Sequence, residues 1–453
     1  MKKEKENRKK NRIRKGSILL IWLFLWQAAS WLIGNSLLFA GPVETVMALW
    51  KEAILPVFWQ TVLLSLLRVA SGFLSAFLLG ILLGVLGARY QILQEFLVPV
   101  LWFCKAVPVA CFAVLLLIWW GAGWLSFAIC FLVTLPVIYV NVSEGILGTD
   151  RKLLEMASVF KMPAWNKVFY IYRPAVAPFL ESGIKTALGM SIKAGVAAEV
   201  IGMADYSIGG EIYMSKIYLD IPGVFAWTAV VIGLGIGLEK TVLFLWKHFL
   251  QWKPLWRGRS IPKKKAQPVE IAALGKRFGE KEIFSDVTKV LYPNHVYCLM
   301  APSGGGKTTL LHILAGLMHQ DGGTVLGDMQ VSMVFQEDRL CEDETALRNV
   351  EMVCADREKA LSYLEELVPE AVLQPVKTLS GGMRRRVCIA RALAADAEVL
   401  LFDEPFNGLD EACMHKTVEV VRKKQDGRVL VVATHHKEEV ERLCGEIWNI
   451  PVS

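Results

Sequence analysis

The sequence lacks the signals of a disulfide framework, of a metal-binding cluster and of internal repeats. Its nine cysteines include no C-x-x-C pair and are scattered along the chain, so we interpret them as reduced packing residues. The net charge of +7 comes largely from residues 1–15 and 251–268, which flank the most apolar part of the chain. This placement favours contact with a membrane surface, and we expect no nucleic-acid partner.

Long apolar runs are concentrated in the first 250 residues, in a chain of 453 residues of which 54% are apolar. Six segments are long and apolar enough to cross a bilayer. The first is too long for the core of a signal peptide and has no clean small-residue cleavage site. The sequence therefore predicts six transmembrane helices, at residues 17–39, 61–88, 96–119, 125–142, 179–203 and 224–249.

Basic residues predict the orientation of these spans. Residues 1–15 carry nine Lys or Arg and are typical of a cytoplasmic tail. Five more lie in the loop at 144–177, whereas the two longer loops predicted on the other side hold one lysine each. We therefore expect a multi-pass protein of the cytoplasmic (plasma) membrane with both termini in the cytoplasm.

The fifth predicted span is unusual in its ionisable residues. Glu181 and Lys185 are four residues apart, which is typical of a helical ion pair or of snorkelling groups near the membrane surface. Lys193 lies deeper, where an ionisable group is a hypothesis of function by default. It either attracts an anionic substrate or pairs with an acid.

A glycine-rich segment between an apolar run and a helical pattern, Ala-Pro-Ser-Gly-Gly-Gly-Lys-Thr-Thr at 301–309, predicts a phosphate site. It differs from the pattern G-x-x-x-x-G-K-[ST] at Ala301, where Pro302 favours an extended conformation that alanine adopts without strain. The alternative is an ordinary glycine-rich turn. The candidate ATP-binding residues are Ser303, Gly304, Gly305, Gly306, Lys307, Thr308 and Thr309, with the Thr308 hydroxyl as a ligand of Mg²⁺.

Two acids end a second apolar run, at 399–404, which is typical of a buried strand. Asp403 is a candidate ligand of Mg²⁺, and Glu404 is a candidate for polarising the water that attacks the γ-phosphate. Taken alone, the pair is equally typical of a helix cap.

The segment Leu-Ser-Gly-Gly-Met at 379–383 precedes three arginines and a helical run. It resembles the signature sequence of ATP-binding cassette (ABC) ATPases, in the form found in sulfonate, nitrate and taurine importers. The resemblance implies that Ser380, Gly381 and Gly382 face the ATP of the opposite subunit. The arginines at 384–386 oppose the helix dipole, so they either contact anions or acidic partners or are solvated surface charges.

Other positions match this family in its usual order along the chain. The resemblance implies that Gln336 senses Mg²⁺ in the Q-loop and that His435 is the switch histidine that contacts the γ-phosphate. It also implies that Asp410 lies in the D-loop. Phe278 either stacks on adenine or is an ordinary core residue.

The predicted cytoplasmic loop at 144–177 resembles the EAA loop of ABC importer permeases, which forms a coupling helix that docks on the ATPase beside the Q-loop. The alternative is an amphipathic helix at the membrane surface. Lys161 replaces the glycine of the pattern, where the family makes a tight turn, and Met156 and Arg173 also differ from it. The matching residues are Glu155, Ala157, Ile171 and Pro174.

The sequence therefore predicts an all-α polytopic membrane domain of the type I ABC importer kind at 17–250 and an α/β P-loop ABC ATPase domain at 269–453. A basic tail at 1–16 and a linker at 251–268 complete the chain. The resemblance implies ATP-driven import of a small solute by a homodimer, with ATP and Mg²⁺ as cofactors and a separate extracytoplasmic substrate-binding protein. The alternatives are a half-size ABC exporter and a regulatory ABC ATPase. The ATPase domain is short for its family, which predicts a trimmed helical subdomain.

Overall fold

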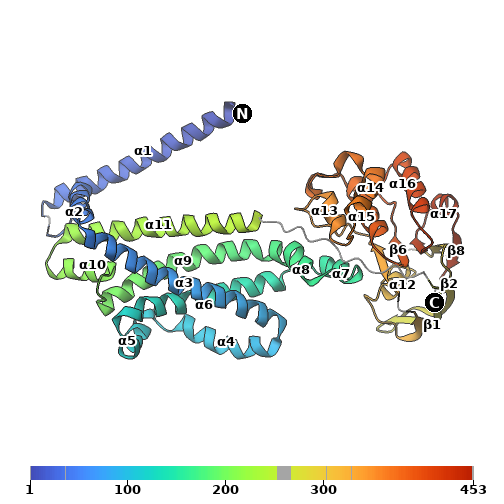
Figure 1. Cartoon of the computed structure of the whole chain (residues 1–453), viewed down its shortest axis with the longest axis horizontal. Coiled ribbons are helices and arrows are strands. Elements are labelled where there is room, and N and C mark those ends of the chain that lie inside the picture. Colours follow the sequence, from blue (N-terminus) through green and yellow to red (C-terminus); the bar gives the residue numbers. More distant parts are fainter. Residues whose placement is uncertain (1, 36, 252–266, 303, 328, 451–453) are drawn as a thin grey trace. The chain divides into compact units, whose positions relative to one another are not determined.

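The computed structural model describes residues 2–35, 37–251, 267–302, 304–327 and 329–450. The chain forms two compact units, one made of Met1–Gly148 and Val176–Trp252 and the other of Thr149–Ala175 and Lys253–Ser453 (Figure 1). Of the predicted linker at 251–268, only residues 251, 267 and 268 are among those described.

The first unit is helical. Glycines on α3 (Pro56–Arg89) let it pack closely against α6 (Ala122–Leu147): a Cβ atom added at Gly72 lies 2.5 Å from the Phe127 carbonyl oxygen, and one at Gly84 lies 2.8 Å from Val142 Cβ. Such close approach of small residues is the usual way in which membrane helices associate. The other helices are α1 (Lys2–Ile33), α2 (Pro42–Ala53), α9 (Arg173–Gly202), α10 (Ile208–Ile217) and α11 (Ile221–Gln251).

The third predicted span, at 96–119, consists of two helices joined at a sharp bend. Helices α4 (Gln91–Ala106) and α5 (Val109–Trp120) meet at an angle of 101°. The break has a local cause, because Pro108 disfavours the helical conformation at the residue before it, and Val107 is extended with ψ 128°. Together the pair returns the chain from the end of α3 to the start of α6 (Figure 1).

Among the described residues, four helices are long and apolar enough to cross a membrane, namely α3, α6, α11 and the part of α1 from Gly16, and the bent pair α4–α5 qualifies if it is counted as one span. Helix α9 has 30 residues but also carries charged side chains, so its span stays a prediction.

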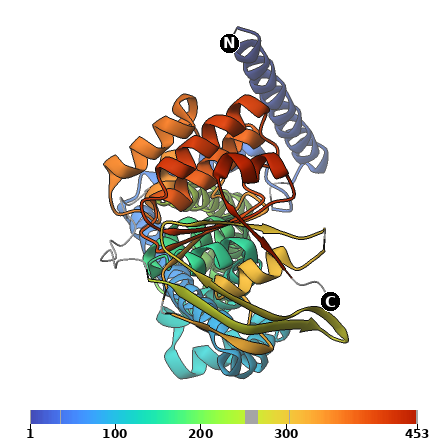
Figure 2. The same ribbon diagram turned by 90° about the vertical axis from the view of Figure 1, so that its right-hand side faces the viewer.

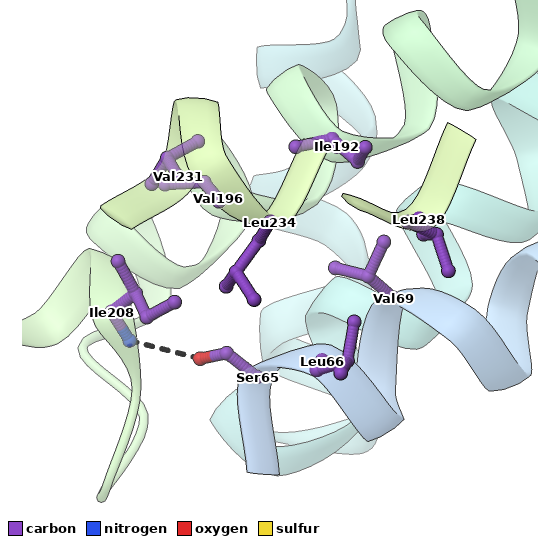
Figure 3. A pocket seen from close by; sticks show the side chains of 9 residues that line it. All are labelled: Ser65, Leu66, Val69, Ile192, Val196, Ile208, Val231, Leu234 and Leu238. Carbon is purple, nitrogen blue, oxygen red and sulfur yellow. Dashed lines mark hydrogen bonds between the residues drawn. The ribbon is translucent and has the colours of Figure 1, made fainter. Parts of the chain in front are cut away.

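One of those charges, Glu199, is a buried anchor between helices. The residue is 1% exposed, and its Oε2 accepts hydrogen bonds from Ser65 Oγ of α3 at 2.9 Å and from the Gly209 N–H of α10 at 3.2 Å. Ser65 Oγ in turn accepts from the Ile208 N–H at 2.9 Å, beside a small cavity otherwise lined by aliphatic side chains (Figure 3). Arg68 Nη1 lies 3.9 Å from Glu199 Oε1. The carboxylate thus holds α3, α9 and the start of α10 together, at a helix N-terminus that favours negative charge.

The second unit contains two sheets. A parallel sheet has the order β5-β6-β7-β3-β8, and an antiparallel sheet has the order β2-β1-β4. In Figure 2, β1 and β2 lie on one side of the parallel strands and the orange-to-red helices on the other. The strands are β1 (Val269–Phe278), β2 (Lys281–Leu291), β3 (Val296–Met300), β4 (Gly322–Leu326), β5 (Val331–Val334), β6 (Val399–Asp403), β7 (Val429–Ala433) and β8 (Glu446–Asn449).

Every residue of the central strands β6 and β7 is buried. Such strands are apolar on both faces, so helices are needed to cover both faces of the parallel sheet. The helices of this unit are α12 (Lys307–Leu314), α13 (Ala346–Glu351), α14 (Arg357–Leu367), α15 (Gly381–Ala394), α16 (Glu411–Lys423) and α17 (Lys437–Leu443). Two 3₁₀ turns, Pro369–Ala371 and Val376–Thr378, lie between α14 and α15.

Residues 149–175 belong to this second unit, although in the chain they follow α6 and extend into the first three residues of α9. They form α7 (Arg151–Val159), α8 (Ala164–Lys167) and a π-helical turn, Val168–Tyr172. Met156 and Ala157 are part of the same buried apolar cluster as the strands of the parallel sheet. The turn expected at Lys161 is made without glycine, because the lysine itself adopts a left-handed conformation with φ 46°.

We predict that Glu199→Ala lowers the free energy of unfolding of the helical unit by about 3 kcal/mol, because two hydrogen-bond donors lose their acceptor and Arg68 loses its counter-charge. Thermal unfolding in lipid nanodiscs measures the effect. Glu181→Ala is the matched control, since it removes a partly exposed carboxylate from the same helix, where Glu181 pairs with Lys185 at 2.8 Å. Equal stability of the two variants contradicts the prediction.

Candidate functional site

The predicted site segments follow four strands of the parallel sheet. The glycine-rich loop follows β3, Gln336 follows β5, Asp403 ends β6, and His435 follows β7. The carboxyl ends of parallel strands meet at one edge of a sheet, which is where open α/β sheets bind their ligands. The fold therefore brings these segments to one edge.

The glycine-rich loop has the backbone of a phosphate cradle. Gly304 and Gly306 are left-handed, with φ 79° and φ 83°, and a Cβ atom at Gly306 lies only 2.7 Å from Ile283 Cγ2. Lys307 is 8% exposed and donates hydrogen bonds to the carbonyl oxygens of Ala301 at 2.6 Å and Pro302 at 3.3 Å. The alanine in place of the first glycine therefore contributes its carbonyl, which any residue provides. Ser303 lies outside the described residues.

Asp403 fits the role of a cation ligand. It is 1% exposed, and burial raises the pKa of its carboxyl group, while a hydrogen bond with the Thr308 side chain acts in the opposite direction. Its Oδ2 is buried and has no hydrogen-bond partner in the described part of the chain. Mg²⁺ prefers oxygen ligands, so an unpartnered carboxylate oxygen beside a hydroxyl group suits it. Gln336, the third candidate, is exposed.

Glu404 is held in an uncommon backbone conformation. Its φ is 45°, and its N–H donates to the Ala433 carbonyl oxygen at 2.9 Å. One carboxylate oxygen lies 3.4 Å from His435 Nδ1, and the other lies 3.5 Å from Asn407 Nδ2. A left-handed glutamate persists only where its surroundings fix it, and such residues cluster at functional sites. The structure thus brings Glu404 and His435 together.

Arg385 is the residue of this site that the sequence left undecided. Its side chain is 4% exposed, and its guanidinium donates hydrogen bonds to carbonyl oxygens at the ends of two strands, within 3.2 Å in each case. Arg384 instead pairs with Glu342 at 3.2 Å, and Arg386 bonds to the Leu367 carbonyl at 2.6 Å. Adjacent residues on a helix lie on different faces, and the face that carries Arg385 is the one that packs against the sheet. The acceptors of Arg385 are Phe335, Gln336, Asp403, Glu404 and Pro405.

The predicted signature segment begins α15. The Ser380 Oγ caps the helix by accepting from the Met383 N–H at 3.3 Å. A Cβ atom at Gly382 lies 3.5 Å from the Gly408 carbonyl oxygen, so this segment adjoins the predicted D-loop. No hydrogen bond or ion pair among the described residues joins 380–382 to the glycine-rich loop.

Two further candidates lie at ends of elements. Asp410 caps α16 by accepting from the Cys413 N–H at 2.8 Å, and this bond lowers the pKa of its carboxyl group. Phe278 ends β1 and is 50% exposed, with the Lys276 ammonium 5.5 Å from its ring centroid. A half-exposed ring at a strand end is available for stacking, unlike a core residue.

The segment at 149–175 contacts the rest of its unit close to Gln336. Glu155 forms an ion pair with Arg339 at 2.6 Å, and Lys152 forms one with Glu337 at the same distance. The Arg339 guanidinium also lies 3.9 Å from the centroid of the Phe335 ring. Two charge pairs therefore connect this loop to residues within three positions of Gln336.

The other two predicted residues of this loop have different surroundings. Ala157 is fully buried in the shared apolar cluster, where a larger side chain has no room. Pro174 lines a cleft between the loop and residues 337–344. Asn166, which the sequence did not single out, is also fully buried and donates to the Met352 carbonyl oxygen at 3.1 Å.

Comparisons with known proteins match both units. Residues 76–246 match the family described as binding-protein-dependent transport system inner membrane component, and residues 284–407 match the family described as ABC transporter. The aliphatic sulfonates import ATP-binding protein SsuB 3 of Rhodococcus jostii is 37% identical over 188 residues, which are 40% of this chain and 69% of that protein.

Two other relatives are similarly close. The Nod factor export ATP-binding protein I of Burkholderia lata is 34% identical over 40% of this chain and 67% of its own length. The sulfate/thiosulfate import ATP-binding protein CysA of Synechococcus elongatus is 32% identical over 41% of this chain and 61% of its own length. The chain thus spans about two thirds of the length of the curated relatives that it matches. A solved dimeric ATP-binding cassette with ADP and Pi is 29% identical over 40% of this chain and 94% of its own, with a TM-score of 0.37.

We predict that Arg385→Ala lowers the free energy of unfolding of this unit by about 3 kcal/mol, because it removes a buried donor from five carbonyl oxygens. The midpoint of denaturant unfolding, followed by circular dichroism, measures the loss. Arg384→Ala is the matched control on the same helix, and its exposed ion pair predicts a change of less than about 1 kcal/mol. A similar loss in both variants refutes the role of Arg385 as an anchor.

Proposed function

The chain belongs to the ABC transporters and joins an importer-type permease domain to an ATP-hydrolysing cassette, and on this premise we propose that it imports a small solute across the cytoplasmic membrane. One observation carries the proposal. The loop at 149–175, which lies inside the permease match, packs into the core of the cassette and pairs Glu155 with Arg339 beside Gln336. A permease loop held at the nucleotide site can transmit the state of that site to the membrane domain.

The residues at the sheet edge have distinct proposed roles. The N–H groups of residues 303–306 and the start of α12 bind the phosphates of ATP, and Lys307 exchanges its loop carbonyls for the β- and γ-phosphates. Thr309, next in the helix, is part of the same cradle. Phe278 stacks on the adenine ring.

Glu404 is the proposed general base. Its carboxylate is held by the left-handed backbone and by Asn407, and it takes a proton from the water that attacks the γ-phosphate. His435, 3.4 Å away, donates a hydrogen bond to the phosphate and keeps the carboxylate in place. Thr308, Asp403 and Gln336 hold Mg²⁺, which when bound neutralises charge on the phosphates.

Two copies of the chain make the complete site in this proposal. Ser380, Gly381 and Gly382 form a second anion-binding helix start, yet no described hydrogen bond or ion pair joins them to the glycine-rich loop of the same chain. We infer that they contact the ATP held by the partner copy, with Asp410 at the same interface. A homodimer then contains two ATP sites.

The permease match supports the proposed direction of transport. Its match to a binding-protein-dependent component favours import with a separate extracytoplasmic binding protein over export, even though one cassette relative is named for Nod factor export. We propose that both termini are cytoplasmic, in line with the basic residues at 1–15. The names of two relatives favour an oxyanion such as a sulfonate or sulfate as solute.

We predict that the purified chain in lipid vesicles hydrolyses ATP and that Glu404→Gln lowers the rate at least about a hundredfold, because the general base is lost. A binding protein loaded with an alkanesulfonate or with sulfate is expected to raise the rate several-fold, whereas the unloaded protein does so less. Hydrolysis that is indifferent to every binding protein refutes the import proposal and favours export or regulation.

We predict that Glu155→Arg uncouples transport from hydrolysis, because it places a second positive charge beside Arg339 and removes the ion pair of 2.6 Å. Solute uptake per ATP hydrolysed should fall about tenfold, and the double variant with Arg339→Glu should recover part of it. Lys152→Glu with Glu337→Lys is a second exchange at a more exposed pair, and we expect a smaller effect from it. No recovery in the Glu155–Arg339 double variant contradicts the role of this pair.

A further inference from the structure

Away from the nucleotide site, three side chains from two helices have the composition and spacing of a zinc site. We propose that Glu411, His415 and Glu438 bind Zn²⁺ and that the ion joins α16 to α17. This cluster does not form a short sequence motif, because Glu438 lies 23 residues beyond His415 in the chain.

The distances between the candidate ligand atoms fit a tetrahedral ion. One ligand atom from each residue lies within 4.8 Å of the others. His415 Nε2 is 3.4 Å from Glu438 Oε1 and 3.9 Å from Glu411 Oε1. Zinc binds imidazole nitrogen and carboxylate oxygen at about 2.0–2.2 Å, and two ligands of a tetrahedral site at that radius are about 3.4 Å apart. The distance from His415 to Glu438 equals this value. A small rotation of the exposed Glu411 side chain would shorten its distance to His415 by the remaining amount.

The arrangement of the helices explains why these atoms converge. Glu411 and His415 are four residues apart on α16 and so lie on one face of it, and Glu438 is in the first turn of α17. The His415 Nε2 atom is buried, and carboxylate oxygens of Glu438 and Glu411 lie 3.4 Å and 3.9 Å from it. One imidazole and two carboxylates are a donor set that zinc accepts, and Mg²⁺ and Ca²⁺ prefer oxygen alone. Three protein ligands leave the fourth position to water.

A competing cation is already at this cluster. Arg442 donates to Glu438 Oε1 from Nε at 3.1 Å and from Nη2 at 3.0 Å. The carboxylate has a second oxygen to which the guanidinium can move, so zinc binding weakens this pair without exposing a buried charge. Removing Arg442 should therefore strengthen zinc binding, which an ordinary surface histidine does not predict.

The site lies between two segments of the proposed mechanism. Helix α16 starts directly after Asp410, and α17 starts two residues after His435. An ion bound by both helices restrains the motion of one segment relative to the other. The binding proposal itself depends only on the described geometry of this unit and not on the proposed direction of transport.

The test measures Zn²⁺ binding to the full-length chain, purified with an affinity tag that contains no histidine, by competition with a chromophoric chelator. We expect one Zn²⁺ per chain at a saturable site, affinity weakened at least about tenfold by His415→Ala and by Glu411→Gln, and affinity raised by Arg442→Gln. Glu411 is 78% exposed in its side chain, so Glu411→Gln tests the site without a risk to folding. Hydrogen exchange is expected to slow in α17 when Zn²⁺ is added to the wild type but not to His415→Ala.

Two histidine variants serve as controls. His319→Ala removes an exposed histidine elsewhere in the same unit, and His436→Ala removes the neighbour of His435, whose ring centroid lies 3.9 Å from its own. Neither should change the affinity. The proposal is overturned if the chain shows no saturable site, if His436→Ala abolishes it, or if both His415→Ala and Glu411→Gln leave it unchanged.

Discussion

The cassette depends on the burial of one positive charge. The guanidinium of Arg385 is removed from water, which is costly unless every donor finds an acceptor. It meets this need with carbonyl oxygens at the ends of β5 and β6, so the first turn of α15 is fixed to the edge of the sheet. The position of the signature segment relative to Gln336 and Glu404 therefore follows from one side chain.

The helical unit is also held together by a buried charged group, in this case a negative one. Glu199 is a buried carboxylate whose oxygens face the Ser65 hydroxyl, the N-terminus of α10 and Arg68. In a membrane, apolar contacts between helices gain little over contacts with lipid, so such hydrogen bonds and the close packing of glycines specify which helices meet. In both units a charge that is unfavourable alone selects one arrangement of its neighbours.

Features that are encoded in short motifs could be predicted from the sequence, whereas features that depend on contacts between distant residues could not. The glycine-rich loop, the acids that end β6 and the histidine after β7 are short motifs, and the parallel sheet necessarily brings them to one edge. Which of three adjacent arginines faces inward, and that Glu155 meets Arg339, depend on packing across 50 or more residues. The sequence contains the cause of the helix break, Pro108. A prediction from hydropathy does not detect the break, because the segments on both sides of it are apolar.

These contacts form an unbroken chain from the permease loop to the proposed general base. Glu155 holds Arg339, Arg339 covers the Phe335 ring, and the Phe335 carbonyl accepts from Arg385. The same guanidinium holds the Glu404 carbonyl. The Arg385 guanidinium is planar and rigid. If residues 335–336 shift, its hydrogen bonds to residues 403–405 must therefore change or α15 must move. We infer that a movement of the loop at 149–175 reaches both halves of the proposed nucleotide site at once, which is what coupling between transport and hydrolysis requires.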